Sequence, residues 1–178
     1  MASKTTKTSP EWLKVAGTAS VDGTGGAGTA ATVRIESSVS LSEKVGMRIW
    51  RTQWNISTLQ TVMDADADEV NFGLSFLAAQ PAGGFVSNSP GVIEWNGVIT
   101  RVIGAGILNE TVRMPVQNDY PAGLLVHPAN LYHWNYVPNA LVAAGPYTIW
   151  WTIFYTTEDI NQDQWDDMWK AMFVAQAG

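Results

Sequence analysis

Residues 147–157 read YTIWWTIFYTT, and this stretch decides the fold class of the chain. It is rich in β-branched and aromatic residues and carries no charge, which is typical of a strand in a well-covered sheet. Trp150 and Trp151 are adjacent, so in a strand their side chains must point to opposite faces. At most one of them can lie inside a sandwich, and the other predicts a second covered surface.

Working outward from this strand, further segments carry strand signals that are separated by Gly and Pro turns. Residues 45–56 (VGMRIWRTQWNI) have no purely polar face, which suits a strand covered on both sides. Residues 92–103 predict a strand with an interruption at Asn96 and Gly97. The remaining predicted strands are residues 32–36, 70–77, 109–116, 123–127 and 131–137. About eight short strands without helical crossovers predict an all-β antiparallel sandwich or barrel.

Residues 161–175 differ from the rest of the chain, because their apolar side chains recur at helical spacing. Asp159 or Asn161 can cap this helix, and Gln164 stands where a capping box needs an amide. An exposed apolar stripe of this size needs cover, either from the helix's own sandwich or from an adjacent subunit, and we expect it to form a subunit interface. The stripe consists of Trp165, Met168, Trp169, Met172 and Phe173.

The first 28 residues predict a flexible arm and a Gly-rich linker ahead of a single domain at 29–178. Residues 21–28 (VDGTGGAG) cannot hold a regular element, whereas residues 11–16 allow a short helix. Lys4, Lys7 and Lys14 make the arm basic, and we expect them to contact neighbouring subunits.

Composition and charge exclude several classes of protein. Charged residues make up 15% of the chain, against about 25% in soluble domains, and nine residues are Trp. This combination indicates a surface that is partly covered by partners. The net charge of −6 predicts that nucleic-acid binding is weak at most. Residues 120–157 lack charge, but prolines divide them, so we expect no transmembrane segment.

The residues for catalysis or metal binding are scarce. The chain has no Cys, which excludes thiolate chemistry and Cys-based metal sites. His127 and His133 are its two histidines, and neither belongs to a recognisable catalytic or metal motif. We expect His127 to end a strand and His133 to lie on a sheet face. We therefore expect no enzyme activity, no cofactor and no His metal site.

One acidic run resembles the start of a calcium-binding loop. Asp64, Asp66 and Asp68 alternate as calcium ligands do in an EF-hand. Glu69 stands where that loop requires Gly, however, and Ser75 stands where it requires Glu. We expect a polar loop between strands, with a weak calcium site at a subunit junction as the alternative.

The order of arm, strands and acidic helix is similar to that of the single jelly-roll capsid proteins of small icosahedral viruses. The likeness rests on residues 47–56 (MRIWRTQWNI), 124–134 (LLVHPANLYHW) and 147–157. It implies an eight-stranded antiparallel jelly-roll sandwich with a flexible N-terminal arm and a short C-terminal amphipathic helix.

The same resemblance implies a function. The chain is then a structural capsid subunit that assembles with copies of itself into a closed shell, with other capsid proteins as further partners. It is made in the host cytoplasm, in keeping with an N-terminus that lacks an apolar signal segment, and it is located in the virion. The arm has fewer basic residues than genome-condensing arms, so packaging by this chain is not expected.

Two other classes of function remain as alternatives. The first is a carbohydrate-binding β-sandwich, in which exposed Trp rings stack on sugars. The second is an enzyme built on a jelly-roll scaffold. A shell subunit should elute as a large oligomer, whereas a binding module should be a monomer that a polysaccharide retains.

Overall fold

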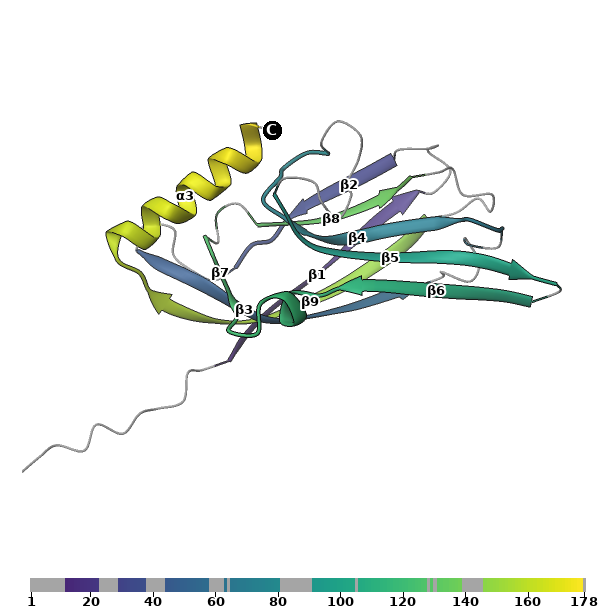
Figure 1. Cartoon of the computed structure of the whole chain (residues 1–178), viewed down its shortest axis with the longest axis horizontal. Coiled ribbons are helices and arrows are strands. Elements are labelled where there is room, and N and C mark those ends of the chain that lie inside the picture. The colour runs from purple at the N-terminus through teal and green to yellow at the C-terminus, as the bar shows by residue number, and fades with distance from the viewer. Residues whose placement is uncertain are drawn as a thin grey trace, which may run out of the picture.

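In the residues that it describes, the computed structural model contains two antiparallel sheets and two helices (Figure 1). It describes residues 12–22, 29–37, 44–57, 63, 65–80, 91–104, 106–127, 129, 131–138 and 146–177. The strands are β1 (Leu13–Asp22), β2 (Thr29–Arg34), β3 (Val45–Ser57), β4 (Glu69–Ser75), β5 (Val92–Ile103), β6 (Gly106–Met114), β7 (Leu124–Val126), β8 (Tyr132–Val137) and β9 (Pro146–Asp159). The helices are α2 (Val116–Asp119) and α3 (Gln162–Ala177).

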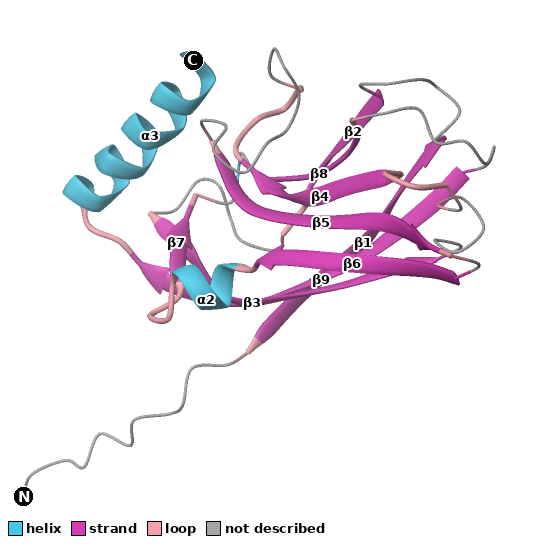
Figure 2. Cartoon of the chain, turned by 45° about the vertical axis from the view of Figure 1, so that its right-hand side comes forward, coloured by secondary structure: helices cyan, strands magenta, loops and turns pink. Residues whose placement is uncertain are grey.

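The two sheets pack face to face as an all-β sandwich, as the sequence predicts (Figure 2). The first sheet has the strand order β1-β9-β3-β7, and the second has the order β2-β8-β4-β5-β6. Every neighbouring pair of strands is antiparallel. The long strands β3 and β9 form the centre of the first sheet.

Strand β9 illustrates how alternation sorts side chains between the core and the outer surface. Trp151 is 4% exposed and packs in the core, whereas its neighbour Trp150 is 42% exposed on the outer face. The prediction that these two residues occupy opposite faces is confirmed. The outer face of the first sheet thus presents a large aromatic side chain to its surroundings.

The buried apolar residues that the structure describes form three clusters, and two of them draw on both sheets. The first apolar cluster lies toward β7, and its buried members are Ile35, Met47, Ile49, Leu74, Val116, Val126, Leu131, Trp151, Ile153 and Tyr155. The second apolar cluster consists of Met63, Val70, Phe72, Val98, Val137, Tyr147 and Ile149. Both clusters draw residues from both sheets, so each holds the two layers together.

Strand β1 corrects the expectation for residues 13–22, which the sequence placed in the arm. These residues pair with β9 along their whole length, from Leu13 opposite Tyr155 to Asp22 opposite Pro146. Gly17, which weakens the strand pattern, has a packing role, because a Cβ there would overlap the Trp151 ring. The expected helix over residues 11–16 is therefore wrong from residue 13 onward.

The rest of the predicted arm and linker, including Lys4 and Lys7, lies outside the described residues. Lys14 is on β1 and is exposed. The described part of the chain has nine strands instead of about eight, and β1 is the strand that the sequence interpretation missed.

Strand β5 runs without a break through Asn96 and Gly97, so the predicted interruption is wrong. The Trp95 ring lies over Gly97 on the outer face of the second sheet, where a Cβ would meet it. The glycine therefore marks the close approach of a ring and does not end the strand.

The C-terminal helix α3 confirms the prediction of an amphipathic helix near the end of the chain. The backbone N–H of Asn161 donates to Gln164 Oε1 at 3.0 Å, and the backbone N–H of Gln164 donates to Asn161 Oδ1 at 2.9 Å. This reciprocal pair is a capping box with Asn161 as the N-cap. Among the described residues no helix is long and apolar enough to cross a membrane.

Candidate functional site

A belt of buried polar side chains lies beside the two apolar clusters that draw on both sheets. We call it the polar belt, and it consists of Thr52, Glu94, Asn96, His133 and Asn135, all of which are buried. Within the second sheet, Asn135 and Asn96 flank Phe72 in register, while His133 and Glu94 flank Leu74. The belt therefore crosses the inner face of this sheet in two adjacent rows.

Glu94 is the charged member of the polar belt. Its Oε1 atom accepts hydrogen bonds from Thr52 Oγ1 at 2.7 Å, Trp54 Nε1 at 2.8 Å and Asn96 Nδ2 at 3.2 Å. Its Oε2 atom is buried and has no hydrogen-bond partner among the described residues. Burial raises the pKa of the Glu94 carboxyl, while the three hydrogen bonds and the charge of Arg113 act in the opposite direction.

His133 lies deeper in the belt, in contact with two indole rings from the first sheet. Its ring centroid is 5.3 Å from that of Trp54 and 6.1 Å from that of Trp151. Burial lowers the pKa of His133 to about 3, and the backbone of Gly73 partly offsets this effect. The imidazole is consequently neutral at physiological pH and packs as a core aromatic ring.

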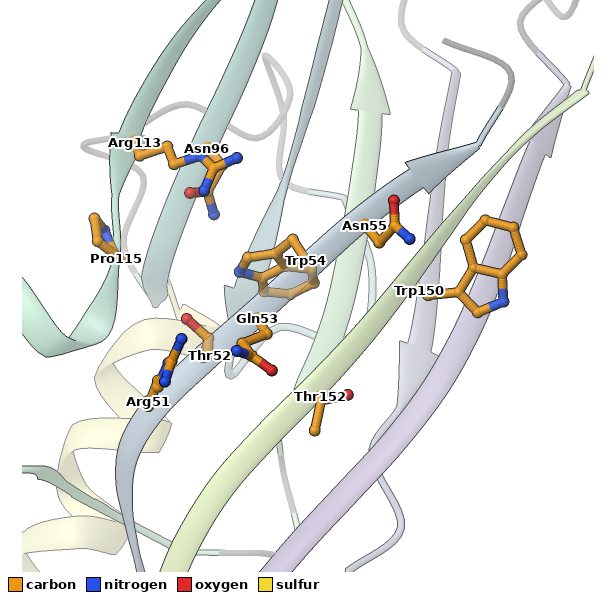
Figure 3. A pocket seen from close by; sticks show the side chains of 10 residues that line it. All are labelled: Arg51, Thr52, Gln53, Trp54, Asn55, Asn96, Arg113, Pro115, Trp150 and Thr152. Atoms are coloured by element: carbon orange, nitrogen blue, oxygen red, sulfur yellow. The ribbon is translucent and has the colours of Figure 1, made fainter.

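The polar belt reaches the surface beside the open edge of β3. Within the described residues, β7 pairs only with Met47, Arg48 and Ile49, so residues 51–57 have a strand partner on the β9 side alone. A hollow of about 680 Å³ lies at this edge (Figure 3). We call it the edge groove, and it is lined by Arg51, Thr52, Gln53, Trp54, Asn55, Asn96, Arg113, Pro115, Trp150 and Thr152.

The lining residues show how the edge groove is placed. Successive side chains of a strand point to opposite faces, yet all residues from 51 to 55 line the groove, so it follows the edge of β3. Figure 3 shows Asn96 and Arg113 on one side of β3 and Trp150 and Thr152 on the other. The groove thus connects the buried belt with the outer face of the first sheet.

Two guanidinium groups give the edge groove its charge. Arg51 lies 5.9 Å from the centroid of the Phe154 ring, and Arg113 is exposed on β6 opposite Asn96. In the part of the chain that the structure describes, the ion pairs involve other residues: Arg48 with Glu158, Arg101 with Glu110, and Lys170 with Asp167. Neither arginine forms an ion pair among the described residues, but the charge of Arg113 acts on the buried Glu94 carboxyl and lowers its pKa, against the larger effect of burial.

The groove also contains a buried acceptor that is not satisfied. Asn96 is 1% exposed, its Nδ2 donates to Glu94, and its Oδ1 has no partner among the described residues. A buried carbonyl oxygen without a hydrogen bond is costly, since desolvation is not compensated.

Aromatic side chains cover the outer face of the first sheet around β3. Trp12, which is 61% exposed, lies 5.9 Å from Trp50 between ring centroids. The Trp50 Nε1–H donates to Thr156 Oγ1 at 2.9 Å, which fixes this ring on the sheet. Together with Trp150 these rings form an aromatic outer face.

A second exposed apolar surface lies at the β5–β6 hairpin. Val102, Ile103 and Leu108 are exposed there, and Ile103 is 66% exposed. In Figure 1 this hairpin points away from α3, so the two elements lie at opposite ends of the sandwich.

The structure describes the side chains of three of the five residues that were predicted to form the helical interface. Trp165, Met168 and Trp169 are half-buried, and the two indole rings lie 4.5 Å and 5.0 Å from the ring of His127. His127 follows β7 directly, as expected, and burial lowers its pKa. The described part of the stripe therefore packs on its own sandwich, while the side chains of Met172 and Phe173 lie outside the described set.

Two residues of the acidic run, Asp66 and Asp68, accept hydrogen bonds from backbone N–H groups. Asp66 Oδ1 accepts a hydrogen bond from the Val102 backbone N–H at 3.0 Å, and Asp68 Oδ2 accepts one from the Ala65 backbone N–H at 3.0 Å. Asp64 lies outside the described residues. Among the residues that are described, no group of three or more acidic, His or Cys side chains is arranged to hold a metal ion.

Comparison with known proteins does not place the chain in a family. No family model matches it, and no curated protein sequence matches it significantly. Its function is therefore inferred from the sheet topology, the edge groove and the exposed apolar surfaces.

Proposed function

We propose that this chain is a structural protein, the jelly-roll subunit of a self-assembling closed shell such as a viral capsid. The observation that carries the proposal is the strand order. Strands β1, β9, β3 and β7 form one sheet and β2, β8, β4 and β5 belong to the other, so that early and late strands are neighbours in both sheets. This order supports the proposal of a double Greek-key jelly roll, in which β6 would be an added edge strand.

The distribution of exposed apolar side chains supports the same proposal. A shell subunit must contact several neighbours at once, so it needs more than one apolar contact surface. Trp12 and Trp150 are exposed on the outer face of the first sheet, and Ile103 is exposed at the tip of the β5–β6 hairpin. Aromatic and apolar residues of this kind are enriched where subunits bury one another.

The partners and the location of the chain follow from this proposal. Copies of the same chain are the main partners, with other capsid proteins as further ones, and the virion is the location after synthesis in the host cytoplasm. A net charge of −6 favours a shell in which another component neutralises any genome.

Electron microscopy of purified protein tests this function. We expect closed particles from the wild-type chain and loss of particles for Ile103→Asp, because a buried unpaired charge opposes assembly. Ala79→Asp adds the same charge at another exposed position and serves as the control. The proposal is wrong if the wild type forms no particles, or if both variants assemble as it does.

The aromatic outer face favours one alternative, a carbohydrate-binding module. Trp12, Trp50 and Trp150 offer ring surfaces on which sugars stack. Such a module would remain a monomer and bind to an immobilised polysaccharide. A monomeric chain that a polysaccharide column retains would replace the shell proposal with this one.

A further inference from the structure

The first sheet has one strand fewer than the second, and one strand position beside β3 is only partly filled. Within the described residues, β7 fills this position opposite residues 47–49 of β3, and no strand pairs with residues 51–57 on the same side. On the β9 side, residues 51–57 keep an unbroken register. Alternate residues of this stretch therefore direct their backbone N–H and C=O groups toward an open edge. We call the space beside residues 51–57 the open strand position.

The inner face of β6 lies uncovered across from the open strand position. Asn96 and Val98 of β5 are buried, and their cross-strand partners on β6 are Arg113 and Thr111. Cross-strand partners point to the same face of a sheet, yet Arg113 and Thr111 are exposed. The described part of the first sheet thus has no strand over this half of β6, and one added strand would cover it.

We propose that the open strand position binds an extended, acidic peptide segment of another protein, which pairs with the edge of β3 and covers the inner face of β6. Addition of a strand to an exposed sheet edge is a recurring mode of peptide recognition. A peptide that matches residues 51–57 spans about 23 Å at the usual rise of a strand. The proposed site goes beyond shell formation and does not depend on it.

The charge along the open strand position selects an acidic segment. The edge groove follows this position, and its lining contains Arg51 and Arg113 but no acidic residue. The charge of Arg113 also acts on the buried Glu94 carboxyl, whereas Arg51 lies over the Phe154 ring. A peptide carboxylate opposite Arg51 is within reach of a charge-assisted hydrogen bond. Arg51 therefore sets the main preference for an acidic residue, and Arg113 adds to it from the inner face.

The second sheet leaves room for a single extended segment but not for a second sandwich. Strand β5 lies beneath β3, since Thr52 and Trp54 donate hydrogen bonds to Glu94. If a second copy paired its β3 antiparallel with this edge, the twofold axis would be perpendicular to the sheet. Both second sheets would then lie on the same side, and β5 of the copy would overlap β6. A lone peptide segment has no second layer and avoids this overlap.

The N-terminal residues of this chain match the open strand position less well. Residues 1–11 carry Lys4 and Lys7 against Glu11, so their net charge has the same sign as the two groove arginines. Charge therefore favours an acidic segment of another protein over the N-terminus of a neighbouring copy.

Fluorescence anisotropy with the full-length chain tests the proposal. The probes are labelled nine-residue peptides of Val and Thr, each with Glu at two adjacent positions, and matched sets with Gln or Lys in place of Glu. We expect at least one acidic peptide to bind about tenfold more tightly than its Gln and Lys counterparts and than a peptide of residues 1–11. Equal or tighter binding of any of these comparison peptides overturns the proposal, as does no binding of any acidic peptide.

Backbone methylation distinguishes strand pairing from a simple charge contact. An added strand directs alternate N–H groups to β3 and the others away from it. N-methylation of one alternate set in the preferred acidic peptide should therefore weaken binding about tenfold or more, whereas methylation of the other set should change it less than about threefold. Equal effects of the two sets would show that the peptide does not bind as an added strand, and the proposal would then be wrong.

Two matched pairs of variants locate the site. Arg51→Gln should weaken binding of the preferred acidic peptide about tenfold, whereas Arg34→Gln, at an exposed position on the opposite edge strand β2, should leave it unchanged. Thr111→Trp should fill the open strand position and abolish binding, whereas Glu110→Trp adds the same bulk to the other face of β6 and should not weaken it. An unchanged affinity for Arg51→Gln or Thr111→Trp, or equal losses within either pair, contradicts the proposal. Circular dichroism checks that the variants keep their sheet content.

Discussion

The first and second apolar clusters and the polar belt beside them have opposite roles in the same core. The clusters bury aliphatic and aromatic side chains, and this burial drives the two sheets together. The belt places Glu94, Asn96, His133 and Asn135 in the same interior, where polar groups without full hydrogen bonding cost free energy. Stability therefore comes from the first and second apolar clusters, whereas the polar belt is organised around the edge groove.

The largest expected effect is the loss of a cluster residue. Phe72→Ala should lower the free energy of unfolding by about 3–5 kcal/mol, because Phe72 is fully buried in the second apolar cluster. Phe154→Ala is the control, since Phe154 lies half-buried on the outer face and should cost clearly less. Urea denaturation measures both. Equal costs would mean that the cluster does not dominate stability.

The next effect is the dependence of the free energy of unfolding on pH, which arises from a histidine of the polar belt. His133 has a pKa of about 3 when folded, below its ordinary value of 6.5, so the unfolded chain binds a proton first as pH falls. His133 should therefore reduce stability by about 1.4 kcal/mol for each pH unit below 6.5, down to its folded pKa. The lowered pKa of His127 acts in the same direction.

Urea midpoints at pH 7, 6 and 5 check this prediction. His133→Gln should flatten the acid dependence relative to the wild type, because the substituted residue does not titrate. The contribution of His127 remains in both proteins and cancels in the comparison. An identical slope in the two proteins would show that His133 is not protected from protons in the folded state.

A smaller effect is expected where the belt is unsatisfied. Neither amide atom of the Asn135 side chain has a hydrogen-bond partner among the described residues, and the residue is fully buried. Asn135→Val should therefore raise the free energy of unfolding by about 1–2 kcal/mol. Asn55→Val, on the exposed side of β3, should change it little. Destabilisation by Asn135→Val would mean that the amide has a stabilising partner in solution.

The smallest effect concerns Glu94. Because burial raises its pKa, the folded chain holds the proton above the ordinary value of 4.5, and the stabilising contribution is lost as pH rises. Glu94→Gln keeps an acceptor for Thr52 and Trp54 and should stay within about 1 kcal/mol of wild type at pH 5. At pH 8 the variant should be the more stable protein. A variant that is less stable at pH 8 than at pH 5, relative to wild type, contradicts this account.

Local sequence signals predicted most of the fold. Alternation and turn residues located the strands from β2 to β9, and the Asn161 to Gln164 spacing located the helix cap. Strand β1 was missed because residues 11–16 also allow a short helix and a Gly-rich segment follows, whereas the pairing of this strand with β9 depends on residues far away in the chain. The local pattern of residues 13–22 therefore cannot reveal this pairing.

The site was less accessible to sequence reasoning. Glu94 and Asn96 alternate on one face of residues 92–103, which is a signal of a polar inner face, but the interruption expected at Asn96 and Gly97 concealed it. The edge groove exists because β7 is too short to cover β3 beyond Ile49, and Arg51 and Arg113 line it together only in the folded chain. Such long-range pairing has no local sequence signature.

Light scattering coupled to size exclusion tests the central claim, that this sandwich is a shell subunit, most directly. The chain has a mass of 19.3 kDa, and the proposal predicts a discrete particle of many times that mass. The particle should persist on dilution and remain homogeneous across moderate salt. A species of 19.3 kDa at every concentration and salt would contradict the proposal.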